Sequence, residues 1–245
     1  MSTAKEWSKP SAIEYYYQNR HDMSDLYPSE LVFLPRVLFP GAKVLDVGCA
    51  SGGFYNIMRS FEPHIEYTGI DISETAIELA RQIYPDVRFQ VTDGINIPFE
   101  DNTFDLVHCT SVLVNDPRYK EIVKELYRVS NRFVLVDIRL LKDMESGLDF
   151  EQSFYKIQYD SEVAEGTVPY VVSDADEVAN YMLRLVPKPQ ALRGTGYFHQ
   201  VAKEAETPFA EVCMTIFLLQ KGNAETQATQ VDLQDLPIEF SIAQP

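Results

Sequence analysis

The chain has 245 residues, 45% of them hydrophobic, which is enough to fill the core of one domain with a small addition but not two full domains. Its 37 acidic and 21 basic residues give a net charge of -16, which would repel a polyanion over most of the surface and argues against a nucleic-acid partner. We find no apolar run of bilayer length and no apolar signal core, so we expect a cytoplasmic protein with no membrane partner.

The cysteine content argues against a metal centre. Cys49, Cys109 and Cys213 stand far apart in apolar, strand-like contexts, and their spacing is not that of metal ligands. We therefore expect three reduced thiols in the core and no bound metal.

Helices and strands are predicted to alternate over the first half of the chain. In chain order we expect a helix at 29–38, a strand at 44–47, a helix at 53–60, a strand at 67–70, a helix at 74–84, strands at 88–91 and 104–109, a helix at 118–128 and a strand at 132–138. This alternation is typical of a doubly wound α/β fold, in which a parallel sheet carries helices on both faces and ligands bind at the C-terminal ends of the strands.

The pattern changes after residue 138. An aromatic-rich insertion at 141–174 precedes a predicted helix at 174–185, and two strands at 191–199 and 211–220 would form an antiparallel pair. The insertion could be a lid over the substrate or a hairpin that extends the core. We divide the chain into one domain at 1–221, with an N-terminal cap at 1–40, and a C-terminal tail at 222–245 that is loosely held or packed on a partner.

A glycine turn after the first predicted strand indicates a cofactor loop. Gly48, Ala50 and Gly53 are one substitution from the dinucleotide fingerprint, and Asp71 follows Gly53 by 18 residues, so spacing alone leaves NAD open. Asp46, two residues before the first glycine, would repel a pyrophosphate and attract an ammonium group. The loop therefore suits a zwitterionic or cationic ligand.

Four blocks of sequence follow one another between residues 42 and 138. They read VLDVGCASGG, YTGIDIS, VTDGINIPFEDNTFDLVHCTSVL and ELYRVSNRFVLVDI. In this order they resemble the class I, Rossmann-like S-adenosylmethionine-dependent methyltransferases. The resemblance implies a mostly parallel, seven-stranded sheet closed by the antiparallel pair. It also implies S-adenosylmethionine (SAM) as cofactor and S-adenosylhomocysteine (SAH) as product.

The resemblance also implies roles for the residues that follow the strands. Asp46 with Gly48, Cys49 and Ala50 would surround the methionine part of the cofactor. Asp71 would accept hydrogen bonds from both ribose hydroxyls, although it could instead cap the helix that begins near Ser73. The remaining implied contacts are Ile72 packing on the adenine, Asp93 and Gly94 binding it at its amino group and through the backbone, and Thr110 completing the cofactor site.

Methyl transfer requires alignment more than side-chain chemistry, and it needs a general base only when the acceptor must lose a proton. His108 is the candidate base, but it shares a strand face with Phe104 and Leu106, so a buried structural histidine is the alternative. The candidate substrate-binding residues are Tyr16, Tyr17, Tyr155, Tyr159 and His199.

Together these features predict a methyltransferase that acts on oxygen or nitrogen of a small-molecule metabolite or natural-product intermediate. The acceptor is then a small molecule, and a homodimer is left open. Two alternatives remain: an NAD-dependent oxidoreductase, and a noncatalytic module of the same fold that binds a cofactor or a partner.

Overall fold

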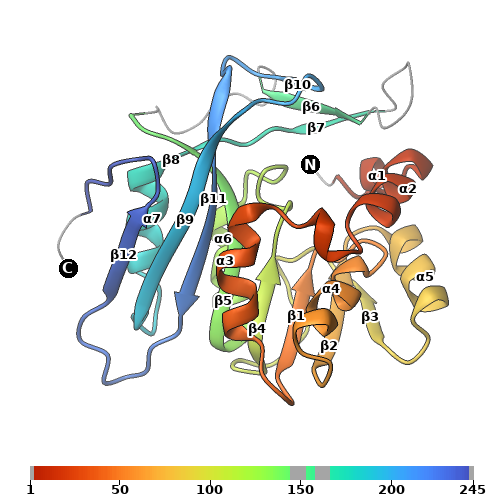
Figure 1. The fold of residues 1–245 in the computed structure, drawn as a ribbon, viewed down its shortest axis with the longest axis horizontal. Helices are drawn as coiled ribbons and strands as arrows, with labels where there is room; N and C mark the ends of the chain where they lie inside the picture. The colour runs from red at the N-terminus through yellow and green to blue at the C-terminus, as the bar shows by residue number, and fades with distance from the viewer. Residues whose placement is uncertain (1–2, 144–152, 158–165, 243–245) are drawn as a thin grey trace.

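The computed structural model describes residues 3–143, 153–157 and 166–242 (Figure 1). Within them, nine strands form the main sheet: β1 (Lys43–Val47), β2 (Glu66–Asp71), β3 (Arg88–Val91), β4 (Phe104–Cys109), β5 (Ser130–Leu141), β8 (Ser173–Asp174), β9 (Ala191–Gln200), β11 (Glu211–Gln220) and β12 (Gln230–Asp235). The order across the sheet is β12-β9-β11-β5-β4-β1-β2-β3, and β8 pairs with the end of β5.

The strand directions confirm the predicted fold class. β1 to β5 pair with one another in parallel, and β11 is antiparallel to both β5 and β9. The core of the sheet is therefore the expected seven strands, closed by the antiparallel pair. One difference lies at the edge: residues 230–235 of the expected tail form β12, which pairs in parallel with β9.

Apolar residues alternate along the strands and fill two separate cores, one on each face of the sheet. Val44 and Leu106 belong to one core, and their neighbours Leu45 and Val107 belong to the other. This alternation is what a sheet covered by helices on both faces requires. The helices on the first face are α3 (Pro28–Val37), α4 (Gly53–Phe61) and α5 (Glu74–Ile83), and those on the second are α6 (Tyr119–Val129) and α7 (Ala175–Leu183).

The predicted helix starts have local causes. Ser73 caps α5, since its hydroxyl accepts a hydrogen bond from the backbone N–H of Ala76 at 3.2 Å. Asp174 caps α7 in the same way through Glu177 N at 2.9 Å. Pro28 begins α3, where its missing N–H removes no helical hydrogen bond.

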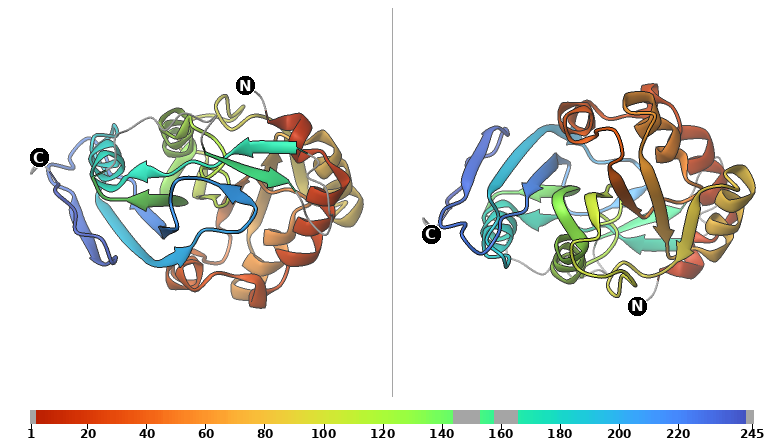
Figure 2. Two further views of the ribbon diagram at one scale, coloured as in Figure 1. Left: turned by 90° about the horizontal axis from the view of Figure 1, so that it is seen from above. Right: turned by 90° about the horizontal axis from the view of Figure 1, so that it is seen from below.

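Two structures lie over the C-terminal ends of the parallel strands. One is a small sheet of β6 (Phe154–Ile157), β7 (Gly166–Pro169) and β10 (Ala205–Glu206), in the order β10-β6-β7 (Figure 2, left). The other is the N-terminal segment with α1 (Ala4–Trp7), α2 (Pro10–Asn19) and the short 3-10 helix η1 (Met23–Asp25). The predicted insertion is thus β-like where it is described.

None of the described helices is both long and apolar enough to span a bilayer.

Candidate functional site

The turn after β1 depends on glycine at Gly48. Its φ is +80°, and a Cβ built there would lie 2.2 Å from Cγ2 of Val112. Any side chain would therefore be strained by the backbone and would clash with the loop after β4. The turn continues through Ala50, which also has a positive φ of 45°, and through Gly52 at 83°.

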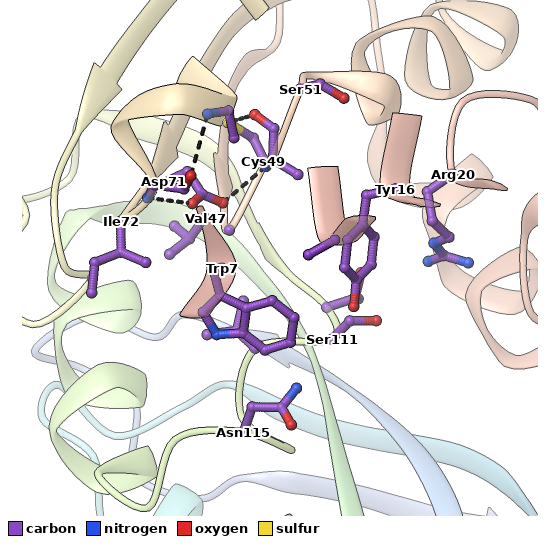
Figure 3. A pocket seen from close by; sticks show the side chains of 18 of the residues that line it. Trp7, Tyr16, Arg20, Val47, Cys49, Ser51, Asp71, Ile72, Ser111 and Asn115 are labelled. Carbon is purple, nitrogen blue, oxygen red and sulfur yellow. Dashed lines mark hydrogen bonds between the residues drawn. The ribbon is translucent and has the colours of Figure 1, made fainter. Parts of the chain in front are cut away.

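Asp71, at the end of β2, ties this turn to the start of α5. One carboxylate oxygen accepts a hydrogen bond from Ala50 N at 2.9 Å, and the other accepts one from Ser73 N at 2.8 Å (Figure 3). Burial raises the pKa of Asp71, while these two N–H donors partly offset that rise. Ser73, and not Asp71, is the N-cap of α5. The carboxylate of Asp71 can accept about four hydrogen bonds, so positions beyond those taken by Ala50 N and Ser73 N are left for a ligand.

A pocket opens above this turn, at the C-terminal ends of β1 to β4. The glycine turn and the residues that follow β2, β3 and β4 line it, and Figure 3 shows Asp71 and Ile72 beside Cys49 of the turn. From the N-terminal segment come Trp7 and Tyr16, whose rings meet edge to face with centroids 6.1 Å apart. The pocket therefore lies where ligands bind in doubly wound sheets, between the strand ends and the cap.

The N-terminal segment packs directly on the glycine turn. A Cβ at Gly53 would lie 2.0 Å from the carbonyl oxygen of Arg20. The Arg20 guanidinium lies over the rings of Tyr27 and Phe54, with its Cζ 4.7 and 4.9 Å from their centroids, and it pairs with Glu30 at 2.5 Å. These contacts hold the cap against the cofactor loop.

Most of the predicted cofactor residues come together in this pocket. The lining includes Gly48, Cys49, Ala50, Asp71, Ile72, Asp93, Gly94 and Thr110. Asp93 also closes its own turn, accepting hydrogen bonds from Ile95 N and Asn96 N at 3.1 Å each. Slight burial would raise its pKa, but these two donors hold it below the ordinary value.

Asp46 and His108 do not line this pocket, nor the second pocket that adjoins it. Both are 1% exposed, and Asp46 accepts from the Tyr67 hydroxyl at 2.5 Å and pairs with His108 Nδ1 at 2.7 Å. His108 Nε2 lies 3.3 Å from the hydroxyl of Thr110, which is itself a lining residue. The Asp46–His108 pair is thus a buried polar network beneath the pocket, and the general-base role of His108 stays a prediction.

A second pocket adjoins the first and extends beneath the small sheet. The two share Trp7, Tyr16, Arg20, Ser111 and Asn115. The remaining lining residues of the second pocket come from the N-terminal segment, the main sheet and the small sheet with its adjoining loops: Tyr15, Tyr27, Val114, Arg139, Tyr155, Lys156, Tyr170, Tyr197, His199, Ala202, Lys203, Glu204 and Met214.

Only some of the predicted substrate-binding residues are found to line this second pocket. Tyr16, Tyr155 and His199 line it. Tyr17 lines neither pocket: it is 46% exposed and stacks on His21. Tyr159 lies outside the described residues.

Several lining residues escaped the sequence analysis, above all Trp7, Ser111, Asn115, Arg139 and Tyr197. Arg139 had a detectable signal, because it and Asp137 interrupt the apolar run of β5 at alternate positions and so point to the same face. Tyr197 had none, since it reaches the pocket only through strand pairing far from the motifs.

With the geometry in place, the comparisons with known proteins define the class. Residues 38–206, more than half of the chain, match the methyltransferase domain family, so the chain belongs to that family. A structure of a SAM-dependent methyltransferase from Methanosarcina mazei shares the fold, with a TM-score of 0.54 and 22% identity over 80% of this chain and 98% of the other. The chain is thus a member of the methyltransferase domain family with the doubly wound fold of a SAM-dependent methyltransferase of known structure.

Curated relatives match a shorter stretch. Demethylmenaquinone methyltransferase from Thermotoga maritima is 32% identical over 90 residues, which are 37% of this chain. The enzyme of the same name from Staphylococcus aureus is 37% identical over 93 residues, 36% of this chain. The match spans 39% of the length of each relative.

The residues of the first pocket fit SAM. The close approach required at Gly48 leaves the backbone of the turn bare, and the partly buried Asp71 offers carboxylate oxygens beside it. Ile72 adds an apolar surface next to Asp71. Among the described residues, no group of three or more His, Cys, Asp or Glu side chains is placed to hold a metal ion.

Proposed function

We propose that this enzyme transfers a methyl group from SAM to an oxygen or nitrogen atom of a small molecule held in the second pocket. The observation that carries the proposal is the continuity of the two pockets through five shared residues. A cofactor bound on the glycine turn and an acceptor under the small sheet would meet at Trp7, Tyr16, Arg20, Ser111 and Asn115.

The cofactor roles follow from the lining of the first pocket. Asp71 would accept the ribose hydroxyls, Ile72 and Gly94 would contact the adenine, and Asp93 would accept from its amino group. Gly48, Cys49 and Ala50 would surround the methionine part. Asp46 would act from behind the turn, through its negative charge, because it does not line the pocket.

Bound SAM supplies an activated methyl group, so the chain itself has mainly to hold, align and dehydrate the reactants. Trp7 and Tyr16 cover the junction of the two pockets and would exclude water from it. Away from this junction, His199 lines the second pocket alone and would accept a proton from an acceptor held there. Burial and the charge of Arg139 lower its pKa, which leaves the imidazole neutral near pH 7.

The curated relatives support a small-molecule acceptor. Their name states that they act on demethylmenaquinone, and they match this chain over 39% of their own length. From these relatives we therefore propose only that the acceptor is a small molecule, and not which small molecule it is. Apart from Ser111, the residues that line the second pocket lie outside the four motifs, so its occupant has to be found by experiment.

Cofactor binding and turnover can be tested separately. Isothermal titration calorimetry should show that SAH binds and that NAD⁺ does not, and tighter binding of NAD⁺ would favour the oxidoreductase alternative. Metabolite extracts should then be incubated with enzyme and methyl-labelled SAM. Label incorporated into a small molecule supports the proposal, whereas SAH binding without any transfer would favour the noncatalytic module.

We also propose that the cap at 1–40, the insertion at 141–174 and the body up to residue 221 form one folding unit. The packing of Arg20 on Gly53 and the pairing of β8 with β5 support this division. The pairing of β12 with β9 adds part of the 222–245 segment to the same unit. A single cooperative unfolding transition would agree with this division, and two transitions would contradict it.

A further inference from the structure

The second pocket is basic although the protein is strongly acidic. Its charged lining residues other than histidine are Arg20, Arg139, Lys156, Lys203 and Glu204, four cations against one anion, in a chain of net charge -16. The anionic partners of three of these cations, Glu30, Asp137 and Glu206, do not line the pocket. Positive side chains therefore outnumber negative ones in the lining of this pocket.

Arg139 lies at the base of this pocket on the central sheet. It is 7% exposed, and its Nη1 pairs with Oδ2 of Asp137 at 2.8 Å. Strand register places Arg139 opposite Met214, and Met214 opposite Tyr197. Residues directly opposite one another in paired strands share a face, and all three of these line the pocket.

The guanidinium of Arg139 has donors to spare. It carries five N–H groups, and its contacts with one oxygen of Asp137 and with the Tyr170 hydroxyl cannot engage all of them. Asp137 is itself held by Ser111 N, which donates to Oδ1 at 2.7 Å. Asp137 therefore holds the guanidinium through one N–H group, and because Arg139 lines the pocket, its unused N–H groups are available to a ligand there.

The other cations are less suited to bind a ligand. Arg20 is engaged by Glu30, by the carbonyl of Asp25 at 2.6 Å and by two aromatic rings. Lys156 pairs with Glu206, and the side chain of Lys203 is 91% exposed at the rim. Arg139 is thus the buried cation of the pocket whose partner leaves it able to bind an anion.

We propose that the methyl acceptor carries a carboxylate that binds the guanidinium of Arg139; this inference rests on the proposed function of the second pocket. A planar guanidinium fork matches a carboxylate, and the N–H groups of Arg139 that Asp137 and Tyr170 leave unused would donate to it. A phosphate dianion would bring a second negative charge, and Arg20, the other buried cation of the pocket, is already engaged by Glu30. Tyr16, Tyr155, Tyr170 and Tyr197 line the same pocket and suit an aromatic or partly apolar body for the acceptor.

The surroundings of His199 agree with this assignment. The positive charge of Arg139 adds to burial in lowering the pKa of His199, so a carboxylate bound at Arg139 would offset that charge and act to raise the pKa again. Such an acceptor would be an aromatic or hydroxylated acid, with the carboxylate at the base and the reactive atom toward the cofactor junction.

Three small probes can test the charge requirement directly. Calorimetry with saturating SAH should measure the binding of benzoate, its neutral analogue benzamide and phenyl phosphate to the wild type, to Arg139→Gln and to Arg128→Gln. Glutamine keeps an N–H donor for Asp137 while removing the charge. Arg128 is a matched control, since it is also paired with acids, Asp101 and Glu125, but lines neither pocket.

We expect benzoate to bind the wild type at least about tenfold more tightly than benzamide, because charge-assisted hydrogen bonds to a buried arginine would be lost with the amide. Arg139→Gln should lower benzoate affinity by a similar factor and leave SAH affinity unchanged. Arg128→Gln should change neither. Arg139→Lys keeps the positive charge beside Asp137 but loses the planar fork. Its benzoate affinity should therefore lie between those of the wild type and Arg139→Gln.

The other outcomes overturn the inference. Benzoate that binds no better than benzamide, or equally well to Arg139→Gln and the wild type, would remove Arg139 as the carboxylate site. If Arg139→Gln misfolds and so loses SAH binding, the benzoate affinity of Arg139→Lys is compared with that of the wild type instead. Tighter, Arg139-dependent binding of phenyl phosphate would assign a phosphate instead. Failure of the wild type to bind SAH would count against the proposed function and not against the carboxylate site.

Discussion

The two pockets differ in how they are built. The first takes its floor from turns that follow consecutive parallel strands, β1 to β4, and its shape depends on backbone geometry at positions such as Gly48. The second takes side chains from positions as far apart as Trp7 and Met214. A change of side chain can therefore alter the second pocket without disturbing the first.

The two pockets also differ in charge. The first is lined by Asp71, Asp93 and Asp116 against the single cation Arg20, whereas cations dominate the second. SAM carries a sulfonium, so an acidic first pocket and a basic second pocket would favour opposite charges on the two reactants. Substitutions on one side should then leave binding on the other side nearly unchanged. Four experiments address the cofactor side, the network beneath the pockets and the acceptor side in turn.

The largest effect is expected from Gly48→Ala. The added methyl group would face Val112 at a positive φ, so the turn must shift and SAH affinity should fall by roughly 100-fold. Gly41→Ala is the matched control, because Gly41 has a φ of 78° with nothing within 4 Å of the added atom. It should cost about 1 kcal/mol of stability and leave SAH affinity intact.

Calorimetry and thermal unfolding of both variants would measure these effects. A second substitution, Val112→Ala in the Gly48→Ala background, should recover part of the affinity, since it removes the atom that clashes. If Gly41→Ala weakens SAH binding as much as Gly48→Ala does, the close contact with Val112 is not the reason that the turn needs glycine.

His108→Asn tests the network beneath the pockets. Loss of the bond to the buried Asp46 should lower the free energy of unfolding by about 1.5–3 kcal/mol, measured by urea denaturation, while SAH affinity per folded molecule changes little. His64→Asn, at an exposed position, should have no such effect. Unchanged stability with reduced turnover on an identified acceptor would instead support the general-base prediction for His108.

Asp71→Ala should weaken SAH binding by at least about tenfold, because charge-assisted bonds to the ribose hydroxyls would be lost in a buried site. Asp86→Ala removes the same charge from an exposed position outside both pockets and serves as the control. Calorimetry on folded protein measures both. Equal affinities for the two variants would remove Asp71 from the cofactor site.

Tyr155→Ala should have the smallest effect, a roughly threefold to tenfold loss of benzoate affinity with no change for SAH, since one aromatic contact is removed from the second pocket alone. Tyr17→Ala is the control, because Tyr17 was predicted beside it but is exposed and lines neither pocket. A loss with Tyr17→Ala and none with Tyr155→Ala would reverse this assignment, and a loss of SAH affinity with Tyr155→Ala would contradict the independence of the pockets.

Local sequence was sufficient for most of the cofactor side. Gly48 and Ala50, with their left-handed backbone, and Asp71 at the end of a strand produce a turn whose geometry is set within a few residues. Parallel strands then bring the ends of β1 to β4 to one edge, so that Asp93 and Thr110 join the same pocket. The same local logic did not reveal that Asp46 faces His108 and Tyr67 behind the turn, because that depends on the packing of neighbouring strands.

By itself, the sequence determined the alternation of strands and helices, the glycine turn and the membership in this methyltransferase class, because each depends on local backbone preference or on contiguous motifs. On the acceptor side the sequence predicted Tyr16, Tyr155 and His199, but only tertiary structure decided which other side chains join them. Arg139, Met214 and Tyr197 become neighbours only when β11 pairs antiparallel to both β5 and β9, and residues 230–235 become a strand only because the edge of β9 accepts them. Such long-range pairing leaves no local signal, since strand register is set by the packed sheet as a whole.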